Sequence, residues 1–123
     1  MKPIFSPGKN IAMKVPVHEY EKTVAFYREI LEFEEIDASS QDTVDSVTFK
    51  FGDKNLWIDK IAGLSQAEVW LEVVTNDIDL ASEYFEESNC VRRDEIEPLP
   101  DGFKAFWLAN PANIIHLINE QNT

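Results

Sequence analysis

AMKVPVHEYEKTVAFY, at residues 12–27, decides the fold, because a stretch of the same design, WLEVVTNDIDLASEYF, follows 58 positions later at residues 70–85. Each stretch reads as a short strand, an acidic turn residue (Glu19 or Asp77) and a helix with an aromatic pair near its middle. Alternating apolar segments then predict a hairpin after each helix. Two copies are too few for a solenoid. The pattern therefore indicates a duplicated module, and a groove between similar halves is a natural ligand site.

The elements are expected in the order β-α-β-β-β, twice. After a lead-in over residues 1–9, the first module, at about 10–60, should hold a strand, a helix and three strands, at 10–17, 19–31, 33–37, 47–51 and 56–60, with a loop over 38–42. The second module, at about 68–119, should hold a strand, a helix, a weaker strand and a closing hairpin, at 68–75, 77–88, 93–99, 103–108 and 114–119. Asp77 is expected to cap its helix, and Asn89 to end it in the left-handed conformation.

Composition narrows the class of protein. A chain of 123 residues with 44% hydrophobic residues is expected to form one compact domain, residues 1–123. The net charge of -12 disfavours nucleic acid and anionic membranes, and indicates either simple solubility or an acidic cleft that attracts cations. The single cysteine, Cys90, excludes an internal disulfide and fits the cytoplasm, and the first residues do not resemble a secretory signal.

Three segments carry a family resemblance: TVAFYREILEF at 23–33, NDIDLASEYFEESN at 76–89 and FWLANPANIIHL at 106–117. Together with the two copies in the correct order, they resemble the glyoxalase/bleomycin resistance/dioxygenase superfamily, also called vicinal oxygen chelate proteins. The resemblance implies an α+β fold in which two modules form one domain with a concave cup. The chain departs from the family pattern at Glu32, where glycine is usual, and in the shortened turn Asn110-Pro111-Ala112-Asn113.

The resemblance also implies where metal ligands would lie, namely at Ala12, Trp57, Trp70 and His116. A divalent metal needs about three protein donors, and only His116 of these four can donate an electron pair. We therefore expect no metal and no cofactor. His116 itself is either a hydrogen-bonding residue of the sheet or a ligand-binding one.

Strand alternation places further candidates on the face of the cup. If Met13, Val15, Leu56, Ile58, Leu71, Val73, Ile115 and Leu117 pack beneath the helices, their neighbours face the cup. The predicted ligand-binding residues are Trp57, Asp59, Trp70, Glu72, Trp107 and His116. The alternative is that the tryptophans only fill space and that Lys14 or Lys50 pairs with the two carboxylates. His18 and Cys90 are expected to be structural.

The sequence favours metal-free binding of a small aromatic or cationic molecule by a homodimeric protein. One alternative is a metal-dependent lyase, isomerase or dioxygenase with a rearranged site drawn from Asp59, Glu72 and His116. A second alternative is a non-catalytic interaction module. The fold itself does not decide between enzymes and binding proteins.

Overall fold

The computed structural model describes residues 2–36 and 45–121. The predicted loop at 38–42 lies outside the described residues. The chain divides into two compact units, each described by itself below. Lys9–Trp70 forms the α1 unit, and Met1–Gly8 with Leu71–Thr123 forms the α2 unit. Strands β1 and β5 each pass from one unit into the other.

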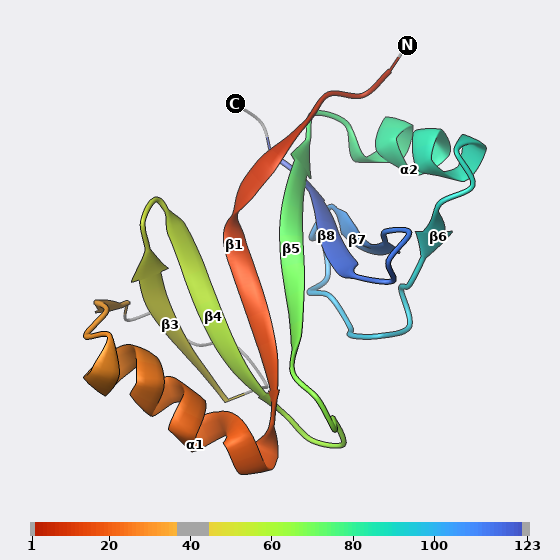
Figure 1. The fold of residues 1–123 in the computed structure, drawn as a ribbon. Helices are drawn as coiled ribbons and strands as arrows, with labels where there is room; N and C mark the ends of the chain where they lie inside the picture. Colours follow the sequence, from red (N-terminus) through yellow and green to blue (C-terminus); the bar gives the residue numbers. More distant parts are fainter. Residues whose placement is uncertain (1, 37–44, 122–123) are drawn as a thin grey trace. The chain divides into compact units, whose positions relative to one another are not determined.

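The α1 unit contains the first β-α-β-β-β series (Figure 1). Its elements are β1 (Phe5–Pro16), α1 (Val17–Ala25), the π-helical turn η1 (Phe26–Ile30), β2 (Glu35–Ile36), β3 (Ser46–Phe51) and β4 (Lys54–Ile61). Strand β4 pairs parallel with β1 and antiparallel with β3, which pairs with β2. The buried face of α1 brings Tyr20 and Val24 onto the sheet, where the core residues are Val15, Phe49, Leu56 and Ile58.

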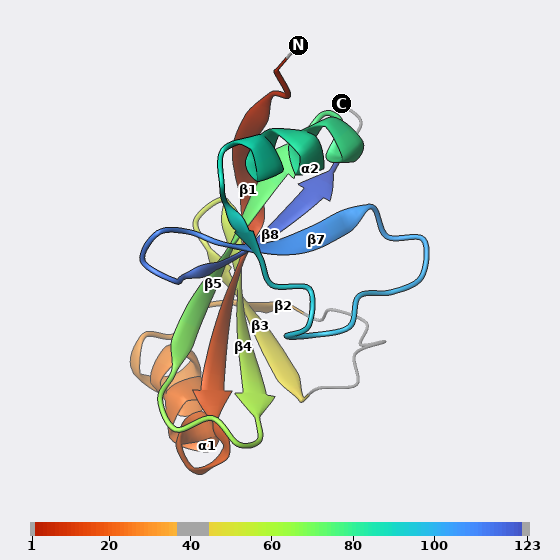
Figure 2. The same ribbon diagram turned by 90° about the vertical axis from the view of Figure 1, so that its right-hand side faces the viewer.

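The α2 unit repeats the order (Figure 2). Its elements are β5 (Glu68–Thr75), α2 (Ile78–Glu87), β6 (Val91–Arg92), β7 (Ala105–Ala109) and β8 (Ile115–Glu120). Strand β8 pairs parallel with β5 and antiparallel with β7, which pairs with β6. Helix α2 packs on this sheet through Ala81, and the core of the unit adds Phe106, Leu108 and Ile118. The mixed pairing and the two helices confirm the predicted α+β class.

Local chemistry explains both ends of α2. The Asp77 carboxylate accepts a hydrogen bond from the backbone N–H of Leu80 at 3.0 Å, which confirms the predicted cap. Asn89 follows the helix with φ of 61°, the left-handed conformation predicted for it. Helix α1 differs, since Pro16 at its N-cap provides no side-chain hydrogen bond. It begins at Val17, two residues before the predicted start, and its last turn is π-helical.

Two predicted elements were wrong. Residues 5–9 belong to β1, although they were expected to be a lead-in. The strand expected at 93–99 is replaced by β6 at Val91–Arg92, and the chain then turns, with the Ile96 N–H bonded to the Arg93 carbonyl. The backbone N–H of Trp107, which a longer β6 would have bound, donates instead to the side chain of Asp94, so the pairing of β6 with β7 ends there.

Candidate functional site

The face of the α1-unit sheet that points away from α1 carries most of the candidate residues. Met13, Val15, Leu56 and Ile58 belong to the helix side, as predicted. Because side chains alternate along a strand, their neighbours on β1 and β4 lie on the opposite face. The parallel register aligns Ala12 with Trp57 and Lys14 with Asp59. We call this surface the Trp57 face.

Lys14 and Asp59 form a buried ion pair on the Trp57 face. The Lys14 Nζ lies 2.8 Å from Asp59 Oδ2, and the two side chains are only 6% and 12% exposed. The hydroxyl of Ser46 donates to the other oxygen, Asp59 Oδ1, at 2.6 Å. The charge of Asp59 is therefore balanced inside the protein, as the sequence alternative of pairing with Lys14 proposed.

The same ammonium group lies over an aromatic ring. The Lys14 Nζ is 4.4 Å from the centroid of the Trp70 ring, which is within cation–π range. Trp70 is half-buried, and its indole N–H donates to Glu68 Oε2 at 3.2 Å. Lys14 of β1 thus contacts both Asp59 of β4 and the ring of Trp70 of β5.

Trp57 is oriented by an asparagine that the sequence reading did not select. Its indole N–H donates to Asn10 Oδ1 at 2.8 Å, and the amide of Asn55 donates to the same oxygen at 3.2 Å. Asn10 precedes Ala12 by two positions and Asn55 precedes Trp57 by two, so both share the face. In the sequence, this alternation could have indicated that Asn10 and Asn55 lie beside Trp57. The ring of Trp57 is half-buried and held at its nitrogen.

In the α2 unit, Asn119 binds the Glu72 carboxylate, and Gly8 leaves room for the Glu72 side chain. The amide of Asn119 donates to Glu72 Oε2 at 2.7 Å. Gly8 permits the close approach of the Glu72 side chain, since a Cβ there would lie 2.6 Å from Glu72 Cδ. Asn119 is 2% exposed, and its Oδ1 has no hydrogen-bond partner among the described residues. Glu72 is thereby fixed in place on the sheet face opposite α2.

Trp107 lies on the face opposite α2, as expected, but it is 6% exposed. Its indole N–H donates to the Glu97 carbonyl at 2.9 Å, and its backbone N–H donates to Asp94 Oδ1 at 3.2 Å. The segment after β6 therefore fixes both donors of Trp107. This tryptophan offers much less open ring surface than Trp57 or Trp70.

The predicted register of β8 was wrong, and it misplaced His116. In the structure His116 aligns with Leu108, a core residue on the α2 side, whereas Leu117 aligns with Trp107. His116 thus lies on the face opposite Trp107, with its Nδ1 at 3.1 Å from the Ile114 carbonyl oxygen. In the sequence IIHLIN, at 114–119, both the odd-numbered and the even-numbered positions carry apolar residues, so alternation alone does not show which set faces α2. In the structure Ile118 is buried in one core cluster with Phe106, which places the even-numbered set, including His116, on the α2 side.

The positions implied for a metal do not fit one. Ala12 and Trp57 are aligned partners without a donor atom for a metal, the Trp70 nitrogen carries a hydrogen, and His116 lies on the α2 side of its sheet. Across residues 2–36 and 45–121, no group of three or more His, Cys, Asp or Glu side chains is placed to hold a metal ion.

Among the described residues, the pKa values of Tyr20 and Glu95 are clearly shifted, and both residues lie outside the Trp57 face. Burial is the main cause that raises the pKa of the Tyr20 phenol above its ordinary value of 10.0, with Asp45 and Asp59 adding to it. A hydrogen bond from Arg93 lowers the pKa of the exposed Glu95. Neither shift marks a catalytic acid or base on the Trp57 face.

Comparison with known proteins identifies the fold. No protein-family model matches the sequence, and no curated protein matches it. Among solved structures, one similar protein is an Mn(II)-bound glyoxalase from Novosphingobium aromaticivorans. The alignment covers 96% of this chain and 40% of the glyoxalase chain, with a TM-score of 0.67 and 12% identity. A second is methylmalonyl-CoA epimerase from Streptomyces coelicolor. The alignment covers 98% of this chain and 100% of the epimerase chain, with a TM-score of 0.61 and 14% identity.

A third match carries the superfamily name. It is a glyoxalase/bleomycin resistance protein/dioxygenase superfamily member from Vibrio splendidus, matching 90% of this chain with 97% of its own, at a TM-score of 0.58 and 14% identity. The chain therefore has the vicinal oxygen chelate fold, and the resemblance seen in the sequence is confirmed at the level of the fold. No helix in the described part of the chain is long and apolar enough to cross a bilayer.

Proposed function

We propose that the protein binds a small, flat aromatic molecule without a metal, by stacking it on the Trp57 face. The observation that carries the proposal is that Trp57 and Trp70 share one unit, are both half-buried, and have both indole nitrogens held by neighbouring side chains, Asn10 and Glu68. Rings fixed in this way lose little conformational freedom when a ligand stacks on them.

The polar residues define what the ligand meets beside the rings. Stacking on a tryptophan contributes roughly 0.5–1.5 kcal/mol beyond the area it buries. The carboxylate of Asp59 is balanced by Lys14, so it gives the ligand no unpaired charge to recognise. A preference for cationic ligands would therefore come from the net charge of -12, acting at long range and weakened by salt. Glu72 and Trp107 of the α2 unit are left out of this proposal, because Asn119 binds the Glu72 carboxylate and the Trp107 ring is 6% exposed.

The solved neighbours include enzymes, which makes an enzymatic role the second candidate. Such an enzyme would need a site drawn from Asp59, Glu72 and His116. The ion pair of Asp59 with Lys14 and the position of His116 on the α2 side of its sheet argue against that set. Binding without catalysis is therefore the better supported function.

We place this binding protein in the cytoplasm, where the exposed, unpaired thiol of Cys90 would stay reduced.

The proposal is tested by tryptophan fluorescence of protein treated with EDTA, titrated with matched cationic and anionic aromatic compounds. Trp70→Ala should weaken binding of the better compound by about tenfold, which is ~1.4 kcal/mol. Trp107→Phe is the control and should change the affinity little, because that ring is fixed by Glu97 and almost fully buried. Absence of quenching by either set at millimolar concentration, or binding that needs added metal, would contradict the proposal.

A further inference from the structure

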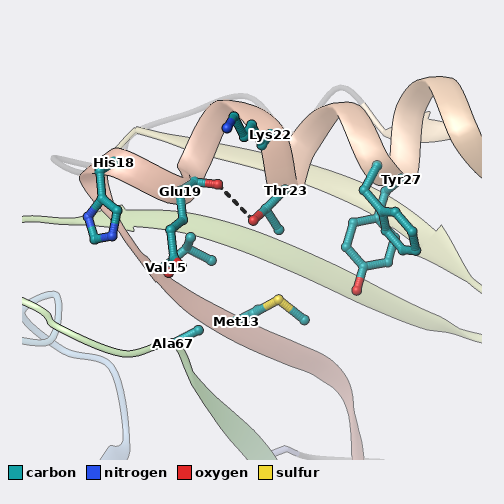
Figure 3. A pocket seen from close by; sticks show the side chains of 9 residues that line it. Met13, Val15, His18, Glu19, Lys22, Thr23, Tyr27 and Ala67 are labelled. Atoms are coloured by element: carbon teal, nitrogen blue, oxygen red, sulfur yellow. Dashed lines mark hydrogen bonds between the residues drawn. The ribbon is translucent and has the colours of Figure 1, made fainter.

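A separate pocket lies on the helix side of the α1-unit sheet (Figure 3). It occupies the space between α1 and β1, beside Ala67 just before β5, and has a volume of about 500 Å³. That volume lies in the range of small-molecule pockets. Its floor residues, Met13 and Val15, point to the opposite side of the sheet from Lys14 and Trp57. The pocket is therefore distinct from the Trp57 face.

Apolar and aromatic side chains form most of its wall. Met13 and Val15 supply the floor, and Phe26 and Tyr27 supply two rings that meet edge to face at 5.1 Å between centroids. Phe26 is 43% exposed, so part of its ring is accessible to a ligand. The rings belong to the π-helical turn, where the Leu31 N–H bonds to the Phe26 carbonyl at 3.0 Å. Such turns are rare and occur frequently at functional sites.

The charged groups are concentrated at one end of the pocket. Figure 3 shows the Glu19 side chain reaching from α1 toward Val15, whereas Lys22 stays alongside the helix. The Thr23 hydroxyl donates a hydrogen bond to the Glu19 carbonyl at 2.8 Å, and His18, at the start of α1, also lines the pocket (Figure 3). The anionic group nearest the apolar floor is thus the carboxylate of Glu19.

From this arrangement we propose that the pocket is a second binding site, which takes an organic cation with an apolar or aromatic body. The body would lie on Met13 and Val15, against the rings of Phe26 and Tyr27, whose faces attract positive charge. Glu19 would face the cationic end. The net charge of -12 repels anionic ligands of the same shape from the whole molecule. Nothing in this site depends on the tryptophans of the Trp57 face.

The methionines provide a local probe for the test. The chain contains two, Met1 and Met13, so protein labelled with methyl-¹³C methionine gives one signal from the pocket floor. The probes are benzyltrimethylammonium and phenylmethanesulfonate, which share a benzyl body and differ in the sign of the charge. The Met13 signal should shift saturably with the cation, and the anion should bind at least about fivefold more weakly.

Variants separate the pocket from the general field of the protein. Glu19→Gln should weaken binding of the cation about threefold or more, whereas Glu21→Gln, an exposed position of the same helix outside the pocket, should leave it unchanged. Ala67→Phe should abolish the Met13 shift by filling the space. The proposal is overturned by no saturable shift at millimolar cation, by equal affinity for the anion, by equal effects of Glu19→Gln and Glu21→Gln, or by a shift that survives Ala67→Phe.

Discussion

Replacing Lys14 with methionine tests whether the Trp57 face is a fixed polar and aromatic surface. The substitution keeps most of the side-chain volume and removes the ammonium group that lies 2.8 Å from Asp59 and 4.4 Å from the centre of the Trp70 ring. It leaves Asp59 with Ser46 as a hydrogen-bond donor and without the lysine charge. A buried carboxylate in that state prefers the unfolded chain, where water solvates it.

The expected loss is large compared with the stability of a small domain. Breaking one partner of a buried ion pair costs about 3–5 kcal/mol, and loss of the cation–π contact is included in that range. Small domains unfold with only about 5–15 kcal/mol. We therefore expect Lys14→Met to reduce the free energy of unfolding by about 3–5 kcal/mol, measured by urea titration followed by circular dichroism.

Two further proteins complete this experiment. Lys50→Met alters an exposed lysine on β3 and should change the stability by less than about 0.5 kcal/mol. The double variant Lys14→Met with Asp59→Leu should recover most of the loss, because apolar replacements of a buried pair are often neutral. A loss for Lys14→Met below about 1 kcal/mol, equal to that of Lys50→Met, would show that water solvates the pair and that the reasoning is wrong.

Three other substitutions test individual contacts. Gly8→Ala should displace Glu72 from Asn119 and cost about 1–3 kcal/mol in urea unfolding, because its Cβ would lie 2.6 Å from Glu72 Cδ; an unchanged midpoint would contradict that packing. Asp77→Ala should cost about 0.5–2 kcal/mol by removing the acceptor for the N–H of Leu80, and a loss near zero would count against the cap. The raised pKa of Tyr20 means that the folded protein keeps a proton that the unfolded phenol loses, so this stabilisation is present below about pH 10 and disappears as the pH rises through the folded value. Tyr20→Phe should therefore lose less stability than the native protein between pH 9 and about pH 11, and parallel curves would refute the assignment.

The repeated design of the sequence predicted the order of the elements, and the family resemblance added the α+β class. The roles of Asp77 and Asn89 at the ends of α2 could be predicted, because helix capping depends on interactions within a few residues. On β1 and β4, polar and apolar residues alternate clearly, so the faces of Met13 and Trp57 could be predicted. Alternation of this kind requires no knowledge of long-range contacts.

The misplaced residues depend on contacts between distant positions. In β8, isoleucine or leucine occupies both parities, and the choice is made by Ile118 packing on Phe106, which lies on another strand. The strand expected after Arg92 ends early because Asp94 bonds to the backbone of Trp107. Likewise, the sequence offered Lys14 and Lys50 as partners for the carboxylates, and only the register of β1 with β4 selects Lys14 for Asp59.

The most direct test of the central claim is ¹⁹F NMR of protein in which the three tryptophans, Trp57, Trp70 and Trp107, carry 5-fluoro groups. The sample would contain EDTA and be titrated with the tightest aromatic compound from the fluorescence screen. We expect the Trp57 and Trp70 signals to shift saturably with one affinity, while Trp107 changes little, because Glu97 holds its indole and the ring is 6% exposed. Binding that leaves Trp57 and Trp70 unchanged, or that appears only after metal is restored, would contradict the account.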